Sequence, residues 1–216
     1  MSKVAILITL HEGDDGSKGC LEEIHRQVDA VSSDGRYSFS IFLNDEGEEG
    51  YQTVWETASK DGADFYLWID HDLSLEEGML ASLLENSEFL RHKAVIAGSV
   101  CRPDKTLLFG GRTRRGRLID PDPIIPVPCQ LFDMAIALIP KYAFSVLEIP
   151  SDFFRRGLLN YGYGSKLAKA AVARMVAPGV LASTRREPRI PSWKDPESSP
   201  KEKLVWLIRS LLNLNH

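Results

Sequence analysis

The amino-acid sequence predicts an α/β protein with a Rossmann-like, doubly wound and mostly parallel mixed sheet with flanking helices. Two observations carry this prediction. Strand-like apolar runs alternate with segments of helical spacing, and the run Phe65–Ile69 is too short for a confident helix and rich in strand formers. A run that is apolar throughout is typical of a strand buried on both faces of such a sheet. The 216 residues are 44% apolar and 26% charged, which suits a soluble globular chain with a sizeable core.

The N-terminal part of the chain alternates between strand and helix. We expect strands at Val4–Leu10, Phe39–Leu43 and 64–69, because each is a short apolar run bounded by polar residues. Between them, Cys20–Val31 carries apolar residues at helical spacing, and Tyr51–Lys60 also has a helical pattern. Strand–helix–strand units of this kind are parallel and right-handed. The carboxyl ends of the three strands should therefore meet at one edge of the sheet.

The rest of the chain is expected to complete the domain. The segment 101–128 is rich in Gly, Arg and Pro and is expected to be an irregular crossing segment. The other expected elements are a helix at Leu75–Leu90, a strand at Ala94–Val100, a strand-like run at Leu131–Pro140, a short helix at Gly164–Ala173 and a last strand at Arg174–Ala177. We expect one domain over 1–183. A Pro-rich loop and an amphipathic helix, Leu204–Leu214, should follow in 184–216.

Composition and charge exclude several classes of protein. The net charge of −4 gives no electrostatic support for nucleic-acid binding, so we expect no nucleic-acid partner. Cys20, Cys101 and Cys129 are far apart and odd in number, which indicates a reducing compartment and neither a disulfide framework nor a zinc site. The N-terminal apolar run fits a strand better than a signal peptide, and no stretch is long enough for a membrane span. We expect a cytoplasmic protein.

Two aspartates, Asp70 and Asp72, end the apolar run at 65–69 abruptly. In open α/β sheets ligands bind beyond the carboxyl ends of the strands, where both carboxylates should lie. Because they belong to one short turn, they can share a hard cation such as Mg²⁺ or Mn²⁺, which prefers oxygen ligands and is often completed by substrate phosphates. The alternative is a capping turn, because Asp72 precedes LSLEEGML and aspartate is a good helix N-cap.

Several segments occur along the chain in a specific order: VWETASKDGADFYLWIDHDLSL, FGGR, LFDMAIALIP, YGYGSKLAKAA and VAPGVLASTRREPRIPSWKDP. In this order they resemble the family 2 glycosyltransferases, and most closely the bacterial rhamnosyltransferase-like branch. The resemblance covers most of residues 3–200. It implies a GT-A fold and the transfer of a sugar from a nucleotide-diphosphate donor to a glycan or lipid-linked acceptor, usually with Mg²⁺ or Mn²⁺.

The resemblance implies that Asp72 and Asp70 hold the metal and the donor diphosphate. Asp72 is the safer ligand, because the family's aspartates fall at the positions of His71 and Asp72. A divalent ion at this place would stabilise the charge that develops on the diphosphate as the glycosidic bond breaks.

The resemblance also places the nucleotide base at the ends of the first two strands. Asp45 falls where an acidic residue takes a base N–H, and Thr9 falls where the backbone meets the base. His11 is a candidate for stacking on the base. Taken alone, Asp45 is equally well explained as a turn residue of an acidic loop. A lone histidine such as His11 is more often only a loop residue, and Thr9 is more often only a strand-end residue.

The acceptor side departs from the family pattern. Where the family has G-D-x-D-Y-G, with an acid that can serve as general base, residues 159–164 read LNYGYG. Asn160 can hydrogen-bond a sugar but cannot take a proton at neutral pH. We expect Asp133 to replace the missing base, because inverting transfer needs a base within reach of the acceptor hydroxyl. The alternative is that Asp133 caps a strand or pairs with an arginine. Asp152 is a weaker candidate.

The remaining acceptor contacts are expected around the FGGR segment and the LNYGYG segment. They are Gly110, Gly111, Arg112, Asn160 and Tyr163. The dense positive cluster of Arg112, Arg114, Arg115 and Arg117 suits a lipid-linked phosphate, and its alternative is a solvated loop. The apolar face of Leu204–Leu214 either packs on its own domain or makes peripheral contact with the inner face of a membrane.

The sequence therefore favours a metal-dependent glycosyltransferase of bacterial-type polysaccharide assembly. The alternative is a GT-A-like domain that has lost the chemistry and binds a nucleotide sugar or a protein partner. The missing acids separate the two hypotheses, because an enzyme needs a substitute base and a binding domain does not. A nucleotidyltransferase is disfavoured, because the loop HEGDDGSKG has one lysine and is too acidic to cradle a triphosphate.

Overall fold

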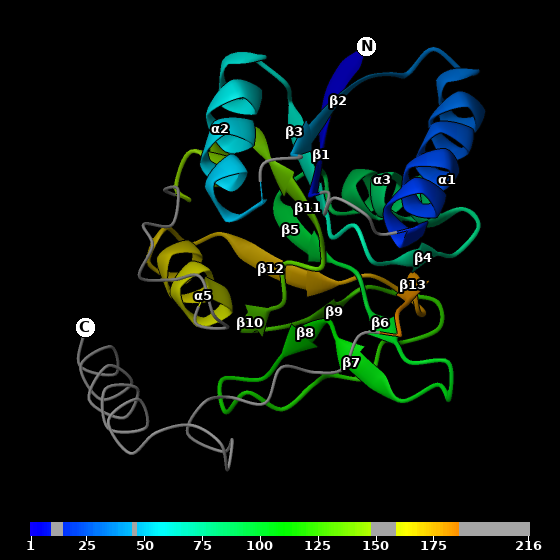
Figure 1. The fold of residues 1–216 in the computed structure, drawn as a ribbon. Coiled ribbons are helices and arrows are strands. Elements are labelled where there is room, and N and C mark those ends of the chain that lie inside the picture. Colours follow the sequence, from blue (N-terminus) through cyan, green and yellow to red (C-terminus); the bar gives the residue numbers. More distant parts are fainter. Residues whose placement is uncertain (10–14, 45–46, 148–158, 186–216) are drawn as a thin grey trace. The chain divides into compact units, whose positions relative to one another are not determined.

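The computed structural model describes residues 1–9, 15–44, 47–147 and 159–185. The chain divides into a compact unit, Met1–Arg186, and a second unit, Glu187–His216. The second unit, which includes the predicted C-terminal helix, lies outside the described residues. The first unit has the mixed α/β fold that the sequence predicts (Figure 1).

Seven strands of the described residues form the main sheet, in the order β2-β1-β3-β11-β5-β12-β9. They are β1 (Ser2–Thr9), β2 (Tyr37–Asn44), β3 (Phe65–Ile69), β5 (Ala94–Ala97), β9 (Val127–Pro128), β11 (Ile136–Pro140) and β12 (Ala173–Val176). The pairs β2-β1, β1-β3 and β5-β12 are parallel, whereas β11 is antiparallel to both of its neighbours and β9 is antiparallel to β12. The predicted mixed sheet is confirmed.

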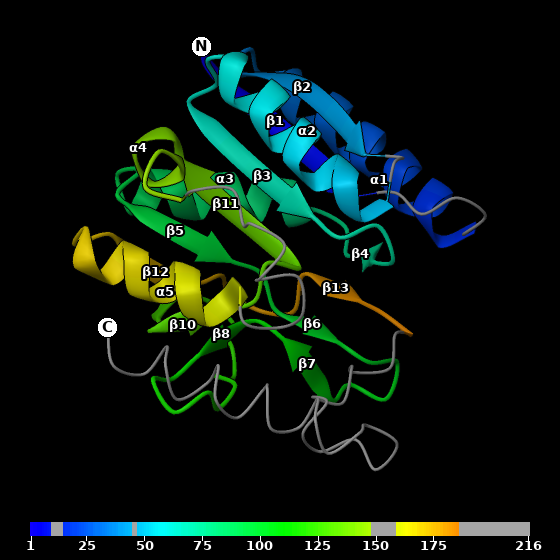
Figure 2. The ribbon, with the colours of Figure 1, turned by 60° about the vertical axis from the view of Figure 1, so that its left-hand side comes forward.

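Helices cover both faces of this sheet (Figure 2). One face carries α1 (Asp15–Ser32) and α3 (Met79–Phe89), and the other carries α2 (Gly47–Lys60), α4 (Lys141–Phe144) and α5 (Leu159–Lys169). The alternation of side chains along a strand explains the two cores. Val4, Ile6 and Ile8 of β1 join the core on the α1 side, and Ala5 and Leu7 join the core on the α2 side.

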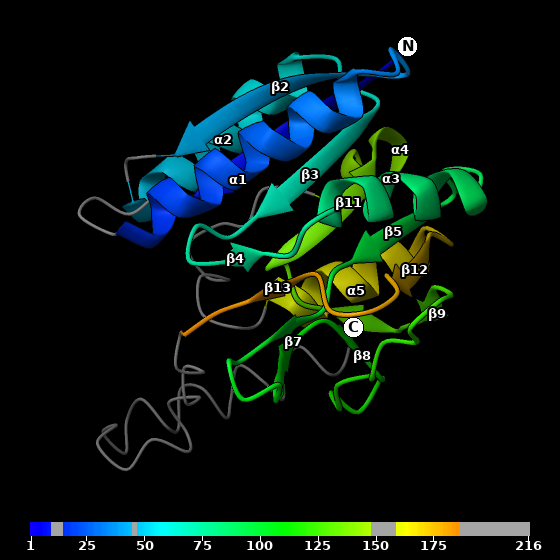
Figure 3. The same cartoon turned by 90° about the vertical axis from the view of Figure 1, so that its right-hand side faces the viewer.

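A second group of short strands lies beside the main sheet (Figure 3). A four-stranded sheet, in the order β4-β13-β6-β7, consists of β4 (Ser74–Leu75), β13 (Ala182–Ser183), β6 (Val100–Cys101) and β7 (Leu107–Phe109). A two-stranded ribbon consists of β8 (Gly111–Arg112) and β10 (Leu131–Phe132). The segment 101–128, predicted to be irregular, therefore contributes several short strands.

Three boundaries differ from the predicted ones for physical reasons. The helix expected at Leu75–Leu90 begins only at Met79, because Gly78 takes a left-handed conformation with φ 75°. The strand expected at Ala94–Val100 leaves the main sheet at Gly98, where a Cβ would lie 2.9 Å from Ile136 Cβ. The helix expected at Gly164–Ala173 begins earlier, at Leu159, and ends before Ala171, whose φ is 55°.

Within the described part of the chain, no helix combines the length and the apolar character that a membrane span requires.

The close approach at Gly111 gives a test of the packing between the β8-β10 ribbon and β12 of the main sheet. A Cβ on Gly111 would overlap Val176 Cγ2 and lie 2.9 Å from Cys129 Cβ. We expect Gly111→Ala to lower the free energy of unfolding by about 1–3 kcal/mol, because overpacking a tight contact forces its neighbours apart. Urea unfolding followed by circular dichroism measures this loss. The matched control is Gly19→Ala in α1, where no atom lies within 4 Å of the added carbon and alanine is the better helix former. Equal losses in both variants would contradict the packing argument.

Candidate functional site

The carboxyl end of β3 holds the two aspartates that the sequence singles out. The five residues of β3 are all buried, and Asp70 and Asp72 directly beyond them are half-buried. The backbone N–H of Asp70 donates to the carbonyl of Ala135 at 2.9 Å, which ties the start of the turn to the segment entering β11. His71 between the aspartates is 9% exposed. The chain therefore presents two partly accessible carboxylates at the edge of a rigid core.

The side chain of Asp70 is held by a residue of β3 itself. Trp68 Nε1–H donates to Asp70 Oδ1 at 3.3 Å. Residues two apart on a strand point to the same face, so the indole and the carboxylate are neighbours by the geometry of the strand. In the sequence, Trp68 is one of the strand formers of the apolar run at 65–69. Its spacing of two from Asp70 is the signal that could have found it.

Cys20 of α1 lies against the same turn. Its thiol contacts the carbonyl oxygen of Asp70 at 3.8 Å. Burial raises the pKa of Cys20 to about 12, with further contributions from the negative charges of Asp72 and then Asp70. Both carboxylates therefore place negative charge near the amino-terminal part of α1.

The carboxylate oxygens of Asp70 and Asp72 fit a metal ion that is also bound by a substrate phosphate. Asp70 and Asp72 offer carboxylate oxygens, the ligands that Mg²⁺ and Mn²⁺ prefer. No group of three or more His, Cys, Asp or Glu residues that could hold a metal is found within residues 1–9, 15–44, 47–147 and 159–185. Mg²⁺ is commonly held by one or two carboxylates together with substrate phosphates, and two carboxylates on one turn meet that requirement.

The three strand ends predicted to converge do converge. Thr9 pairs with Asn44 at the end of β2, and the preceding Ile8 pairs with Ile69 at the end of β3. The backbone of Thr9 is therefore adjacent to the start of the Asp70–Asp72 turn. Asp45, which follows Asn44 in the chain, and His11 lie outside the described residues, so their expected contacts with a nucleotide base stay predictions.

Asp133 is buried and forms an ion pair with Arg112. Its side chain is 5% exposed, and Arg112 Nε donates to Asp133 Oδ2 at 2.9 Å. The backbone N–H of Gly110 donates to the same oxygen at 3.1 Å. A carboxylate in this arrangement is stabilised in its charged form and is not open to an acceptor hydroxyl. The structure thus favours the alternative of arginine pairing over the expected role of Asp133 as a general base.

Arg112 is committed to the local fold as well. Its Nη1 donates to the carbonyl of Gly116 at 3.0 Å, and its Nη2 to the carbonyl of Leu108 at 3.4 Å. The guanidinium therefore ties β8 to strand β7 on one side and to the turn at Gly116 on the other. This position explains Arg112 by folding rather than by the expected contact with an acceptor.

The two glycines of the FGGR segment are also explained by packing. Gly110 has φ +154°, and a Cβ there would lie 3.1 Å from the buried hydroxyl of Ser99. Gly111 is crowded by Val176 and Cys129. Both positions require the absence of a side chain, whatever they contact beyond the protein.

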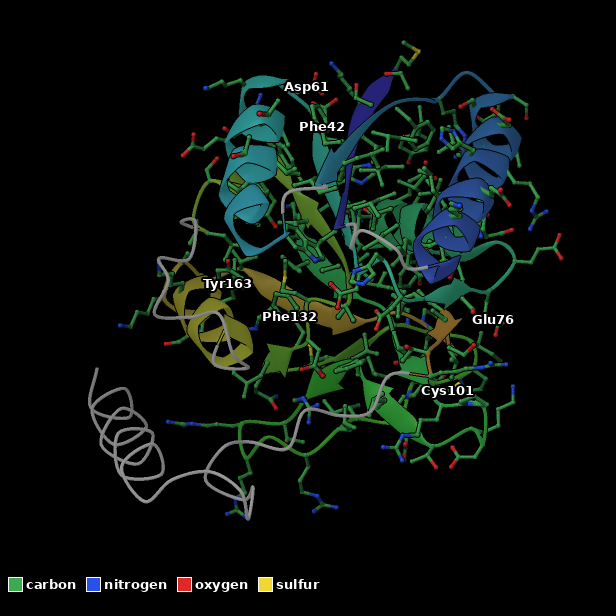
Figure 4. The ribbon with its side chains drawn as sticks, viewed as in Figure 1. Phe42, Asp61, Glu76, Cys101, Phe132 and Tyr163 are labelled. Carbon is green, nitrogen blue, oxygen red and sulfur yellow. The ribbon has the colours of Figure 1, made fainter. Side chains whose placement is uncertain are left out.

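Tyr163 is a core residue in this structure. It is 6% exposed, and its ring stacks beside Trp55 with centroids 6.4 Å apart. Figure 4 shows Tyr163 and Phe132 between α5 and the sheet, and both belong to the core on the α2 side. Burial also raises the pKa of the Tyr163 hydroxyl. The expected contact of Tyr163 with an acceptor sugar is not supported, because that contact needs an exposed face. Asn160 lies in the first turn of α5, and its side chain is outside the described residues.

The fold and the strand-end site together define a GT-A architecture. No protein-family model and no curated protein sequence matches the chain. Among solved structures, GalNAc-T7 crystallised with UDP, GalNAc and Mn²⁺ is similar, with a TM-score of 0.56 and 12% identity over 97% of this chain and 48% of that chain. A197 from STIV has a TM-score of 0.55 and 10% identity over 88% of each chain. Residues 1–349 of TarS from S. aureus have a TM-score of 0.51 and 10% identity over 84% of this chain and 60% of that chain.

These neighbours are GT-A glycosyltransferases, and the chain has their fold. At 10–12% identity the likeness concerns the fold alone. The chain spans 60% of the TarS fragment and about half of GalNAc-T7, so large parts of those two proteins have no counterpart in it.

The buried ion pair gives a test of its role in folding. Asp133→Asn keeps the shape of the side chain but leaves the Arg112 guanidinium without its charged partner. We expect a loss of about 3 kcal/mol in the free energy of unfolding, because removing one member of a buried pair leaves an uncompensated charge. Urea unfolding measures it. The control is Asp34→Asn, which breaks the exposed pair with Arg36 and should cost much less. If Asp133→Asn costs no more than Asp34→Asn, the ion pair does not stabilise this region.

The buried cysteines give a test based on pH. Burial raises the pKa of Cys20 and of Cys129 to about 12, from ordinary values near 9. Between these values the folded chain keeps thiol protons that the unfolded chain releases, so the two thiols should lower the free energy of unfolding as the pH rises. At pH 9 we expect slow alkylation by iodoacetamide, and rapid alkylation after unfolding in urea. Mass spectrometry of the peptides measures the extent of alkylation at each cysteine separately. Equal rates in the folded and unfolded chain would refute the protected position of Cys20.

Proposed function

We propose that this chain is a metal-dependent glycosyltransferase of the family 2, rhamnosyltransferase-like kind, which uses a nucleotide-diphosphate sugar as donor. The observation that carries the proposal is the pair of half-buried carboxylates, Asp70 and Asp72, at the end of the fully buried strand β3 of a GT-A sheet. The GalNAc-T7 structure, which holds UDP, GalNAc and Mn²⁺, supports the class of ligand. We further propose a cytoplasmic role in polysaccharide assembly.

The proposed donor site uses the ends of three parallel strands. Asp72 and Asp70 would hold Mg²⁺ or Mn²⁺, which when bound neutralises the charge developing on the diphosphate leaving group. The backbone of Thr9 would border the nucleotide base, with Asp45 accepting a base N–H and His11 stacking on the ring. The buried β3 would hold the backbone that leads into the Asp70–Asp72 turn before the donor arrives, which would reduce the binding energy lost in ordering the two carboxylates.

The proposed acceptor is a glycan or a lipid-linked sugar. Within the arginine cluster, Arg112 is occupied by Asp133 and two carbonyl groups, whereas Arg114, Arg115 and Arg117 are exposed. In the described part of the chain no ion pair is found for these three exposed arginines. They are the better candidates for an acceptor phosphate, because a free guanidinium fork matches phosphate oxygens.

A specific observation favours a second function. The ion pair between Asp133 and Arg112 occupies the carboxylate that was expected to act as general base. A domain without a base could still bind the donor, since the donor-side residues belong to other strands. The alternative is therefore a GT-A domain that binds a nucleotide sugar, or a protein partner, without transferring the sugar.

The metal site is tested by Asp72→Asn, which removes charge and keeps shape. We expect Mn²⁺-dependent binding of UDP, GDP or dTDP to be lost, while the fold persists, because one of two metal ligands is gone. Calorimetry with each nucleotide, with Mn²⁺ and then with EDTA, measures this. The matched control is Asp64→Asn at the amino end of the same strand, where Asp64 Oδ2 accepts from the backbone N–H of Lys3 at 2.9 Å. That variant should bind like the wild type. Unchanged affinity in Asp72→Asn would remove Asp72 from the site.

A turnover measurement separates the two functions. The wild-type chain, given the nucleotide sugar whose nucleotide binds best, should release the nucleotide diphosphate in the presence of a lipid-linked acceptor, as followed by mass spectrometry. Tight binding with no release over many hours would favour the binding domain. Absence of metal-dependent nucleotide binding would refute both forms of the donor site.

A further inference from the structure

We propose that Trp68 is a positioning residue for Asp70, and that its indole N–H holds this carboxylate in the orientation that binds the metal and the diphosphate. The inference rests on the proposed function, because it concerns how one ligand of that site is oriented. It adds a residue that neither the D-x-D spacing nor the family resemblance singles out.

Strand geometry fixes the relation between the two side chains. Trp68 is the fourth residue of β3, and Asp70 comes directly after the strand. The backbone of Asp70 is still tied to its neighbour, since its N–H donates to the carbonyl of Ala135 at 2.9 Å. The strand conformation thus persists far enough to put Trp68 and Asp70 on one face, and Nε1–H reaches Oδ1 at 3.3 Å.

The Trp68 indole, which donates this hydrogen bond, is packed among other rings, whereas the Asp70 carboxylate that accepts it is more accessible. Trp68 is 8% exposed, and its ring lies 6.2 Å from the ring of Trp55. Trp55 is itself stacked on Phe144 at 4.1 Å, and Phe144 on Tyr66 at 3.7 Å. The aromatic packing therefore fixes where the indole N–H points. Because Asp70 is half-buried and the indole is packed, we infer that the hydrogen bond orients the carboxylate more than it orients the indole.

The chemical consequence concerns metal affinity. Carboxylates that bind a metal are commonly hydrogen-bonded in turn, and removing such a partner typically weakens metal affinity by about 10–100-fold. The hydrogen bond from Trp68 to one oxygen of Asp70 limits rotation of the carboxylate. Less conformational entropy of this side chain would then be lost when a metal binds. A purely structural reason for the hydrogen bond also exists, because a buried indole N–H needs an acceptor. The experiment must therefore separate the two roles.

Trp68→Phe removes the N–H and keeps an aromatic ring, and Trp55→Phe is the matched control in the same aromatic cluster. We expect Trp68→Phe to weaken Mg²⁺-dependent binding of UDP, GDP or dTDP by about 10-fold. The affinity measured in EDTA should stay unchanged. Trp55→Phe should change neither value. The decisive readout is the ratio of the affinity with Mg²⁺ to the affinity in EDTA for each variant, because general loosening of the core would lower both affinities. An unchanged ratio in Trp68→Phe, or an equal drop in Trp55→Phe, would overturn the proposal.

The hydrogen bond itself can be observed without any ligand. In the ¹H–¹⁵N spectrum of the full chain, the indole resonance of Trp68 is identified by its loss in Trp68→Phe. Asp70→Ala should move that resonance upfield, and Asp72→Ala should leave it in place. A Trp68 resonance unaffected by Asp70→Ala would overturn the inference even if the nucleotide binds. A wild-type chain that binds no nucleotide diphosphate would instead refute the proposed function, while the spectrum still decides whether Trp68 orients Asp70.

Discussion

The edge of the sheet that holds Asp70 and Asp72 depends on the complete burial of β3. Its five side chains are between 0 and 8% exposed, and its backbone pairs with β1 on one side and β11 on the other. Because both faces of β3 are buried, a shift of one residue in this register would exchange the two faces and draw Asp64 or Asp70 into the core, where a carboxylate without a partner is costly. The packing of the core thereby also fixes where Trp68 and Asp70 point.

The strands that end at Thr9, Asn44 and Ile69, and their convergence at one edge, could be predicted because their signals are local. The apolar run at 65–69, the aspartates beyond it and the strand–helix alternation are properties of neighbouring residues, and the convergence of the strand ends follows from the handedness of such units. Only the family resemblance predicts roles in nucleotide binding for Asp45 and His11, and both residues lie outside the described residues.

The surroundings of Asp133, Arg112 and Tyr163, which were expected to contact an acceptor, could not be predicted in the same way, because their contacts join residues far apart in the chain. Arg112 and Asp133 meet only because β8 and β10 pair, and no periodicity in either segment indicates this pairing. Likewise, a tyrosine in a Gly-rich segment gives no sign that its ring will stack beside Trp55 in the core. The burial of Tyr163 follows from the docking of α5 on the sheet.

The antiparallel direction of β11 has a consequence for how the protein can evolve. Because β11 is antiparallel to β3, its first residue, Ile136, lies opposite Ile69. The residue before it, Ala135, accepts a hydrogen bond from the backbone of Asp70, so this segment reaches the edge that holds Asp70 and Asp72. Thr9, Asp70 and Asp72 thus belong to the ends of β1 and β3, whereas the neighbouring wall comes from the stretch that ends at Ala135. Under the proposed function, the wall beside the nucleotide site could therefore change in length or sequence while the Asp70–Asp72 turn stays as it is.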